Sequence, residues 1–334
     1  MGLILSPAPA GVDAASNLPP LRPQYVAAPL DALLSQTDVL AVTGFGRAAP
    51  TSTDVRYQRV ALEPALHPAP LEVWRCAGQV EHGHRGALRF SRCADYAFVC
   101  IELDERDFGG IAATTQAAYS RLGAWCRTSA TPYLLRVWNY VDAINAGAGD
   151  AERYRLFCAG RAAGMAADAS YPAASAIGGR DGERRLQVCA LASRVPGTAV
   201  ENPRQVSAWR YPREYGPVAP SFARAMRAPT RSPQVYLSGT AAVVGHASHH
   251  AGDVDAQLAE TLTNLDSLRM AAGAAAPLGN PRSPLRAYVR EPAHAARVHE
   301  ILLRRLGADT PLLILHGDIC RAELLVEIDG VLND

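Results

Sequence analysis

The sequence from His316 to Gly330 reads HGDICRAELLVEIDG, and its apolar run from Leu324 to Ile328 predicts a buried strand. Glu327 lies inside this run, where an ionised carboxylate is costly unless it is paired or used. Apolar neighbours raise the pKa of a carboxyl group, which suits a general acid. The alternative is a structural Glu that faces solvent or pairs with an Arg. Glu327 is therefore the first candidate for a catalytic residue.

The composition is that of a globular protein that is large enough for two domains. The chain has 334 residues, of which 49% are hydrophobic and 19% are charged, so it can build a substantial core. Its 33 basic and 32 acidic residues leave a net charge of +1. This balance gives no electrostatic signature of a nucleic acid or membrane partner, and we expect neither.

The sequence contains no lysine, so every basic side chain other than histidine is an arginine. A Walker A loop, a Schiff-base enzyme and a pyridoxal phosphate anchor all need lysine, which excludes these chemistries. Arginine remains, and its planar guanidinium matches carboxylate ligands. Arginine-rich codon usage is the alternative cause of this bias, but it does not change the chemical exclusion.

The cysteine pattern and the apolar runs predict a cytoplasmic location. The seven Cys form no CxxC pair and are irregularly spaced, which favours reduced thiols. The start, MGLILSPAPAG, lacks the basic region of a signal peptide, and no apolar run approaches the length of a membrane span.

Motifs for metals, nucleotides and hydrolase triads are missing. The histidines at 82, 84, 246, 249 and 250 match neither HExxH nor a zinc spacing, and we expect no metal. The sequence has no GxSxG elbow and no GxGxxG loop, which argues against a serine hydrolase and a dinucleotide cofactor. We therefore expect no cofactor.

The order of expected strands and helices predicts an α+β fold with two similar halves. Residues 1–37 are rich in Pro and Ala and are expected to wrap the surface, followed by domains at 38–195 and 196–334. Aligning residues 115–117 on 256–258 places helix on helix and strand on strand, which indicates a duplication. Strands are expected at 71–76, 87–92, 96–103, 133–141, 186–192, 235–239, 284–290, 312–315 and 324–331, and helices at 111–126, 151–167, 253–272 and 291–306.

The second half, from about Pro217, resembles the RidA/YjgF superfamily. The residues that carry the resemblance are PSFARA (220–225), VYLSG (235–239), DAQ (255–257) and VEI (326–328). The resemblance implies mixed sheets with helices on one face, trimeric assembly, and ligand sites between neighbouring units. The imine-deaminating branch carries an Arg about fifteen residues before the terminal Glu, whereas this chain has Leu312, so imine deamination is not expected.

The whole chain resembles the chorismatase family, which releases pyruvate from chorismate. The resemblance is carried by PYLLRVWNYVDAIN (132–145), ERYRLFCAGR (152–161), NPRQVSAWRYPREYGPVAPSFARA (202–225), YLSGTAAVVGH (236–246) and GDICRAELLVEIDG (317–330). It implies that Glu327 protonates the enolpyruvyl group of chorismate, at its methylene carbon or its ether oxygen. Arginine forks and Tyr or Asn donors would hold the two substrate carboxylates.

The same resemblance implies a set of site residues and a product. Cys320, seven residues before Glu327, is typical of the branch that forms 3-hydroxybenzoate, with 4-hydroxybenzoate as a possible second product. A small buried thiol is the alternative role of Cys320. Arg136 could also pair with a protein carboxylate, and Tyr211 could be a packed loop residue. The substrate-binding residues implied are Tyr133, Arg136, Asn139, Tyr140, Tyr211, Arg224, Gly239 and Ala241.

Two other functions remain open at this point. One is another RidA-like enzyme that acts on an imine or enamine, and the other is a non-enzymatic protein that binds small acids. Incubation with chorismate separates them, because only a chorismatase releases pyruvate. The sequence leaves open whether the chain is a monomer or a homotrimer.

Overall fold

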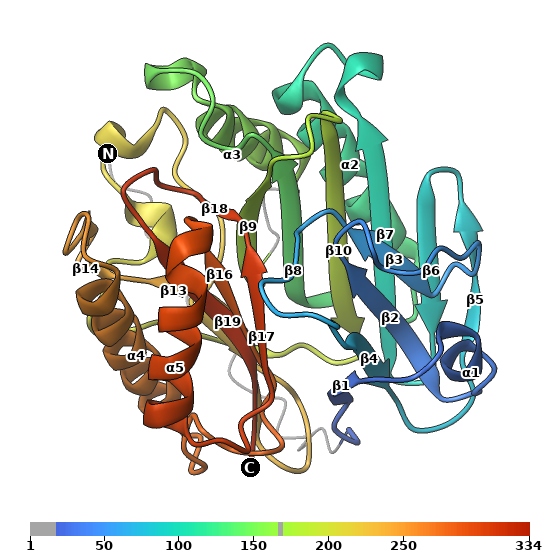
Figure 1. Cartoon of the computed structure of the whole chain (residues 1–334). Helices are drawn as coiled ribbons and strands as arrows, with labels where there is room; N and C mark the ends of the chain where they lie inside the picture. Colours follow the sequence, from blue (N-terminus) through green and yellow to red (C-terminus); the bar gives the residue numbers. More distant parts are fainter. Residues whose placement is uncertain (1–17, 166–169) are drawn as a thin grey trace, which may run out of the picture.

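The computed structural model describes residues 18–165 and 170–334, and it confirms the α+β class. Three mixed sheets with their helices form one body (Figure 1). The expected helix at 151–167 is observed as α3 (Arg153–Gly164), and its expected last residues, 166 and 167, lie outside the described part. No described helix has the length and apolarity that crossing a bilayer requires.

The first repeat is built on a seven-stranded sheet in the order β18-β9-β8-β10-β7-β6-β5. Apolar side chains on one face of this sheet pack against α2 (Ile111–Thr128) and α3, as the period of two along the strands requires. The strands are β5 (Glu81–Arg85), β6 (Leu88–Arg92), β7 (Tyr96–Asp104), β8 (Tyr133–Asp142), β9 (Ala173–Gly179), β10 (Arg185–Ser193) and, from the second half of the chain, β18 (Asp318–Ile319).

The second repeat is a six-stranded sheet in the order β11-β12-β13-β19-β16-β17. Helices α4 (Val254–Ala271) and α5 (Ala295–Leu306) cover its outer face, where leucines at 258, 262, 265 and 268 form the buried stripe of α4 (Figure 1). The strands are β11 (Thr198–Val200), β12 (Ala225–Arg227), β13 (Gln234–Ala241), β16 (Leu285–Val289), β17 (Leu312–His316) and β19 (Val326–Asn333); a separate hairpin pairs β14 (Val243–Val244) with β15 (Ala247–Ser248).

The two repeats share one topology, which the predicted duplication requires. The order β6-β7-β10-β8-β9 in the first sheet matches β12-β13-β19-β16-β17 in the second. In each case only the last pair, β8 with β9 or β16 with β17, is parallel. Helices α2 and α4 occupy the same place in chain order, between the second strand of the repeat and its parallel pair. The repeats can therefore be compared position by position through their strand registers.

Residues 22–75 form a third, smaller sheet in the order β1-β4-β2-β3. Residues 22–34 of the segment expected to wrap the surface (1–37) therefore contain a strand and a helix, while residues 1–17 lie outside the described part. Its strands are β1 (Arg22–Val26), β2 (Val39–Phe45), β3 (Tyr57–Val60) and β4 (Leu71–Arg75), and the short helix α1 (Leu30–Leu34) connects β1 to β2. Leu21, Leu30 and Leu33 are buried, which ties this segment to the core. The pair β2–β3 is parallel and β1–β4–β2 is antiparallel, as in a repeat that has lost its second helix.

The inner faces of the three sheets meet in one aromatic core. Trp74 of the third sheet lies 5.7 Å from Trp138 of β8 and 6.2 Å from Tyr236 of β13, measured between ring centroids. All three rings are buried. Each sheet thus presents helices or solvent on one side and a shared core on the other, and the polar residues buried near this core require a specific explanation.

Candidate active site

Glu327 lies on the central strand of the second repeat and is buried. Its register partners are Ala241 on β13 and Tyr288 on β16, and only 4% of the residue is exposed. Burial raises the pKa of the carboxyl group to about 8, and the nearby charge of Asp329 adds to this effect. Glu327 is therefore neutral at pH 7 and able to donate a proton.

Asp329 lies two residues farther along the same face of β19 and has the opposite character. Arg136 Nη2 donates to its Oδ2 at 2.6 Å, and Arg286 Nε donates to its Oδ1 at 3.0 Å. The hydroxyls of Ser175 and Tyr288 donate to Oδ2 at 2.8 and 3.0 Å. Although its burial acts in the other direction, these partners lower the pKa of Asp329, so this carboxylate stays ionised beside a neutral Glu327.

Two small residues make room for the Glu327 carboxyl group. A Cβ atom built on Gly239 would lie 1.8 Å from Oε1 of Glu327, so no larger residue fits there without moving the acid. Ala241 is buried directly opposite Glu327 in the strand register. Both positions had been predicted at the site, and the structure places both next to its carboxyl group.

Arg224 and Tyr211 form a second part of the site. Arg224 Nη2 donates to the Tyr211 hydroxyl at 2.6 Å and to the carbonyl of Val206 at 2.8 Å. Arg224 is 5% exposed, and its Nε has no hydrogen-bond partner among the described residues. The charge of Arg224 also acts on Glu327, where it partly offsets the raised pKa. This buried guanidinium thus has unused donor capacity close to the acid.

Arg161 shows the same unused capacity, and it was not singled out from the sequence. It is 3% exposed, and its Nε and Nη2 lack partners within the described part of the chain. Its guanidinium lies 5.0 Å from the ring centroid of Tyr119, whose hydroxyl donates to Asn139 Oδ1 at 2.7 Å. The side-chain amide of Asn139 in turn donates to the carbonyl of Ser175 at 2.9 Å. The predicted residue Asn139 is thus linked to Arg161 through Tyr119.

A close helix contact fixes the position of Arg161. A Cβ on Gly160 would lie 2.2 Å from the carbonyl oxygen of Ala112, and one on Gly164 would lie 2.6 Å from that of Gln116. These two glycines allow α3 to lie directly on α2. The spacing of Gly160 and Gly164, with Arg161 between them, is the sequence signal that could have identified this residue.

Arg321 is the third guanidinium with a free donor. Its Nη1 donates to the His246 carbonyl and to Ser248 Oγ at 2.8 and 3.1 Å, while its buried Nη2 has no partner in the described ranges. It stacks on Tyr215 at 4.0 Å and on Tyr211 at 5.0 Å from the ring centroids. No ion pair to a described carboxylate is formed by Arg161, Arg224 or Arg321. Buried cations without a carboxylate partner, such as Arg161 and Arg224, call for anionic ligands.

Cys320 lies between Glu327 and α3. Burial raises the pKa of its thiol to about 12, with a further contribution from Glu327, so the sulfur is protonated. Tyr154 and Cys158 of α3 lie near this thiol. Cys320 belongs to an apolar cluster with Phe222, Ala174 and Ala176, which supplies an apolar wall beside the polar groups.

The structure places Tyr140 and Tyr133 away from the Glu327 carboxyl group, and it commits Arg136, whose charge acts on Glu327, to a partner within the protein. Arg136 is saturated by Asp329, Ser175 and the Val137 carbonyl, so its carboxylate partner is internal. The Tyr140 hydroxyl accepts from Arg286 at 3.3 Å and faces a different cleft. Tyr133 lies at the start of β8 and is 43% exposed. It is five strand residues, or about 16 Å, from Trp138 of the buried aromatic core.

No group of three or more potential metal ligands occurs in the residues that the structure describes. The histidine pair His249 and His250 lies with ring centroids 5.9 Å apart, and His250 pairs with Glu260 at 3.5 Å. The side chains that can act at this site are the carboxyl group of Glu327, the thiol of Cys320 and the guanidinium groups.

Comparison with known proteins agrees with this geometry. Residues 72–192 match the family model described as "Chorismatase FkbO/Hyg5-like, N-terminal". The chain is 35% identical to a 3-hydroxybenzoate synthase of Streptomyces hygroscopicus over 277 residues, which cover 78% of this chain and 80% of that protein. A chorismatase of Streptomyces rapamycinicus is 35% identical over 279 residues, covering 78% and 81%.

The fold agrees in the same way. A crystal structure of a chorismatase superimposes with a TM-score of 0.81 at 30% identity, covering 95% of this chain and 98% of the other. The sequence relatives share more than 30% identity over four fifths of their length, and the structural match extends across all three sheets. The chain therefore belongs to the chorismatase family.

Proposed function

We propose that this protein cleaves chorismate to pyruvate and 3-hydroxybenzoate. The observation that carries this proposal is the pair of carboxyl groups on one face of β19: Glu327 is neutral and Asp329 is ionised. A neutral acid held in a buried site can protonate the weakly basic enolpyruvyl group at pH 7.

Proton transfer from Glu327 to the methylene carbon or the ether oxygen starts the loss of the enolpyruvyl group. Protonation at carbon gives a cation that is stabilised by the adjacent ether oxygen. The Glu327 carboxylate that results is stabilised by the charges of Arg136, Arg224 and Arg290. Water adds to release pyruvate, and a water is lost as the ring aromatises. Chorismate thus gives one pyruvate and one 3-hydroxybenzoate with no net uptake of water.

Arg224 and Arg161 are the proposed forks for the two substrate carboxylates. Both are buried and have donors without partners among the described residues, and neither pairs with a described carboxylate. Tyr211 orients Arg224 through its hydroxyl, and Arg321 adds positive charge at the same end. Gly239 and Ala241 leave space for the carboxyl group of Glu327, which they hold in place beside the substrate. Arg136 and Asn139 do not contact the substrate in this proposal; they position the residues that do.

Cys320 is proposed to favour aromatisation. Its thiol is neutral and lies near Glu327 and Tyr154, so it can pass a proton as water leaves the ring. Without this relay, hydrolysis would stop at the cyclohexadiene diol. The role of Cys320 therefore concerns the product and not the release of pyruvate.

The protein is further proposed to be a monomer. Three sheets of one chain surround a single core, so the chain supplies from within itself the contacts that separate subunits would otherwise make. Light scattering coupled to size-exclusion chromatography should give a mass near 35.5 kDa. A mass near three times that value would contradict this proposal.

The function is tested by incubating the purified protein with chorismate. Pyruvate is measured with lactate dehydrogenase and NADH, and the aromatic product is identified by chromatography against 2-, 3- and 4-hydroxybenzoate. Equal amounts of pyruvate and 3-hydroxybenzoate are expected. A binding protein would take up chorismate without releasing pyruvate, and an imine deaminase would leave chorismate intact. Either result would end the proposal.

A further inference from the structure

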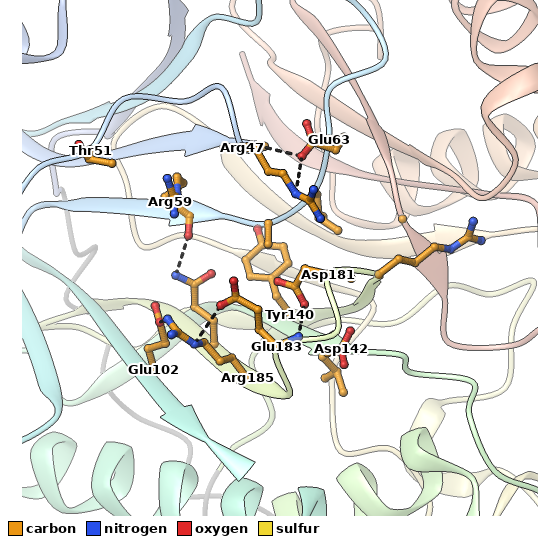
Figure 2. Close-up of a pocket in the computed structure, with 18 of the residues that line it drawn as sticks. Arg47, Thr51, Arg59, Glu63, Glu102, Tyr140, Asp142, Asp181, Glu183 and Arg185 are labelled. Carbon is orange, nitrogen blue, oxygen red and sulfur yellow. Dashed lines mark hydrogen bonds and ion pairs between the residues drawn. The ribbon is translucent and has the colours of Figure 1, made fainter. Parts of the chain in front are cut away.

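A cleft of about 1130 Å³ opens between the first-repeat sheet and the loops of the third sheet (Figure 2). Its lining comes from residues 46–63, from the hairpin at 84–89, and from the ends of β8, β10 and β17. Tyr140 lies in the middle of this view, with Arg59 on one side and Arg47 above it. None of the residues Glu327, Arg224, Arg161 and Cys320 lines it.

Because the two repeats share one strand order, a residue of the first repeat occupies the position that corresponds to Glu327, and it lies in this cleft. In the second repeat, Glu327 on β19 pairs in register with Tyr288 on β16. In the first repeat, the corresponding strands are β10 and β8, and Gln187 pairs with Tyr140. Gln187 thus occupies the position of Glu327, and its amide lies at the same place on the inner face of its sheet. Both Gln187 and Tyr140 line the cleft.

Arg89 is the counterpart of Arg224. Arg224 stands opposite Ser238, whose N–H donates to the Arg224 carbonyl at 3.0 Å. The register of β13 shifts by one residue between Leu237 and Thr240. Counted from Leu237, which pairs with Gly330 as Val99 pairs with Ala190, Ser238 corresponds to Cys100, and Cys100 pairs in register with Arg89. The acid and the cation of one site therefore have an amide and a cation at the same positions of the other.

Arg89 also has the donor capacity that a ligand needs. Its Nη1 donates to the Tyr57 carbonyl at 2.6 Å and its Nη2 contacts Cys100 Sγ at 3.5 Å. It forms no ion pair with a described carboxylate, whereas the neighbouring Arg185 pairs with Glu102 at 2.8 Å. Arg59, exposed at the edge of the cleft, also has no carboxylate partner in the described ranges. The cleft thus holds two guanidinium groups that are not neutralised by ion pairs.

We infer that this cleft is a second ligand site, which binds a small aromatic carboxylate without transforming it. Arg89 holds the carboxylate, and the rings of Tyr57 and Tyr140 with Leu62 contact the aromatic ring. Gln187 can donate a hydrogen bond, but its amide cannot serve as the acid that Glu327 provides. The inference does not depend on the reaction at Glu327, because it rests on the register and on the cleft alone.

Equilibrium dialysis with ¹⁴C-labelled benzoate tests this site in the intact protein. The wild type is compared with Arg89→Gln and with Ala87→Trp, which fills the cleft from an exposed position and leaves the core unchanged. Each variant should lose one equivalent of bound benzoate, or bind it at least tenfold more weakly. Thermal unfolding of each variant shows that it is folded.

Arg224→Gln provides the matched control, since it removes a guanidinium from the Glu327 site and leaves the cleft intact. This variant should retain the equivalent that Arg89→Gln and Ala87→Trp lose. Wild-type binding in the folded Ala87→Trp protein would overturn the proposal, as would the absence of any benzoate that is retained by Arg224→Gln.

Discussion

Gly239 and the carboxyl group of Glu327 are so close that the Cα of Gly239 can carry only a hydrogen atom on that side, because a Cβ at position 239 would lie 1.8 Å from Oε1 of the acid. Gly239→Ala should therefore displace the carboxyl group and lower kcat by at least about 100-fold, the scale of a misplaced catalytic group. Steady-state kinetics with chorismate measure this change. Gly123→Ala in α2 is the control, since its added Cβ would lie 3.5 Å from Arg127, an ordinary contact. Equal activity of the two variants would contradict the assignment.

Replacement of the acid should separate activity from stability. Glu327→Gln should lose about 10²–10⁴-fold in kcat, because the amide cannot donate the proton. Burial raises the pKa of Glu327 from 4.5 to about 8, so the folded protein binds more protons than the unfolded chain between these values. Wild-type stability therefore falls as pH rises through this range, and the Gln variant lacks this loss.

Urea unfolding of both proteins at pH 5 and pH 8 measures the difference. From pH 5 to pH 8, the free energy of unfolding of Glu327→Gln should rise relative to the wild type by about 3 kcal/mol. A difference that is independent of pH would mean that Glu327 titrates normally.

The pH dependence of turnover follows from the same group. Only protonated Glu327 can act as the acid, and its pKa of about 8 belongs to the free enzyme. The value of kcat/KM should therefore be level near pH 7 and should decrease above about pH 8, approaching tenfold per pH unit. A profile that stays flat to pH 10 would exclude this carboxyl group as the proton donor.

Arg161 should matter for binding more than an arginine that is already paired. Arg161→Gln should raise KM for chorismate by about 10–1000-fold, since it removes a fork that holds a substrate carboxylate. Arg304→Gln on the exposed face of α5 is the control, because Arg304 is exposed and pairs with Glu300 on the same helix. An unchanged KM in Arg161→Gln would remove this residue from the site.

Cys320 should control the product. Cys320→Ala should shift the product from 3-hydroxybenzoate toward the cyclohexadiene diol, while the rate of pyruvate release changes by less than about tenfold. Chromatography of the products, with pyruvate assayed in parallel, separates the two effects. An unchanged product ratio in Cys320→Ala would assign the thiol to packing alone.

Much of the fold could be predicted because periodic apolar patterns specify single elements. The expected strand at residues 186–192 is observed as Arg185–Ser193, and the helix expected at 253–272 is Val254–Ala271. β9, with the sequence AASAIGG, was not predicted because Ala, Ser and Gly have little preference for strands. β9 lies between β8 and β18, so hydrogen bonds to these two strands, and not local propensity, hold it in the sheet.

The site was harder to predict because ion pairing is a long-range property. Arg136 and its partner Asp329 are separated by 193 residues, so nothing near Arg136 shows that its guanidinium is already satisfied. Arg161 has the reverse problem: it lies on an ordinary helix, and only the structure shows that its donors are unpaired. Glu327 could be proposed from sequence because both its apolar neighbours and its strand are local.

Asp329 receives one guanidinium from each half of the chain, Arg136 from the first and Arg286 from the second. A second half expressed by itself would carry Glu327 beside an aspartate that has lost one counterion, and the proton affinity of the acid would change. The second half therefore depends on the first for the charge balance around its own acid: the half that lacks the catalytic carboxyl group supplies one of the two cations that set the proton affinity of Glu327.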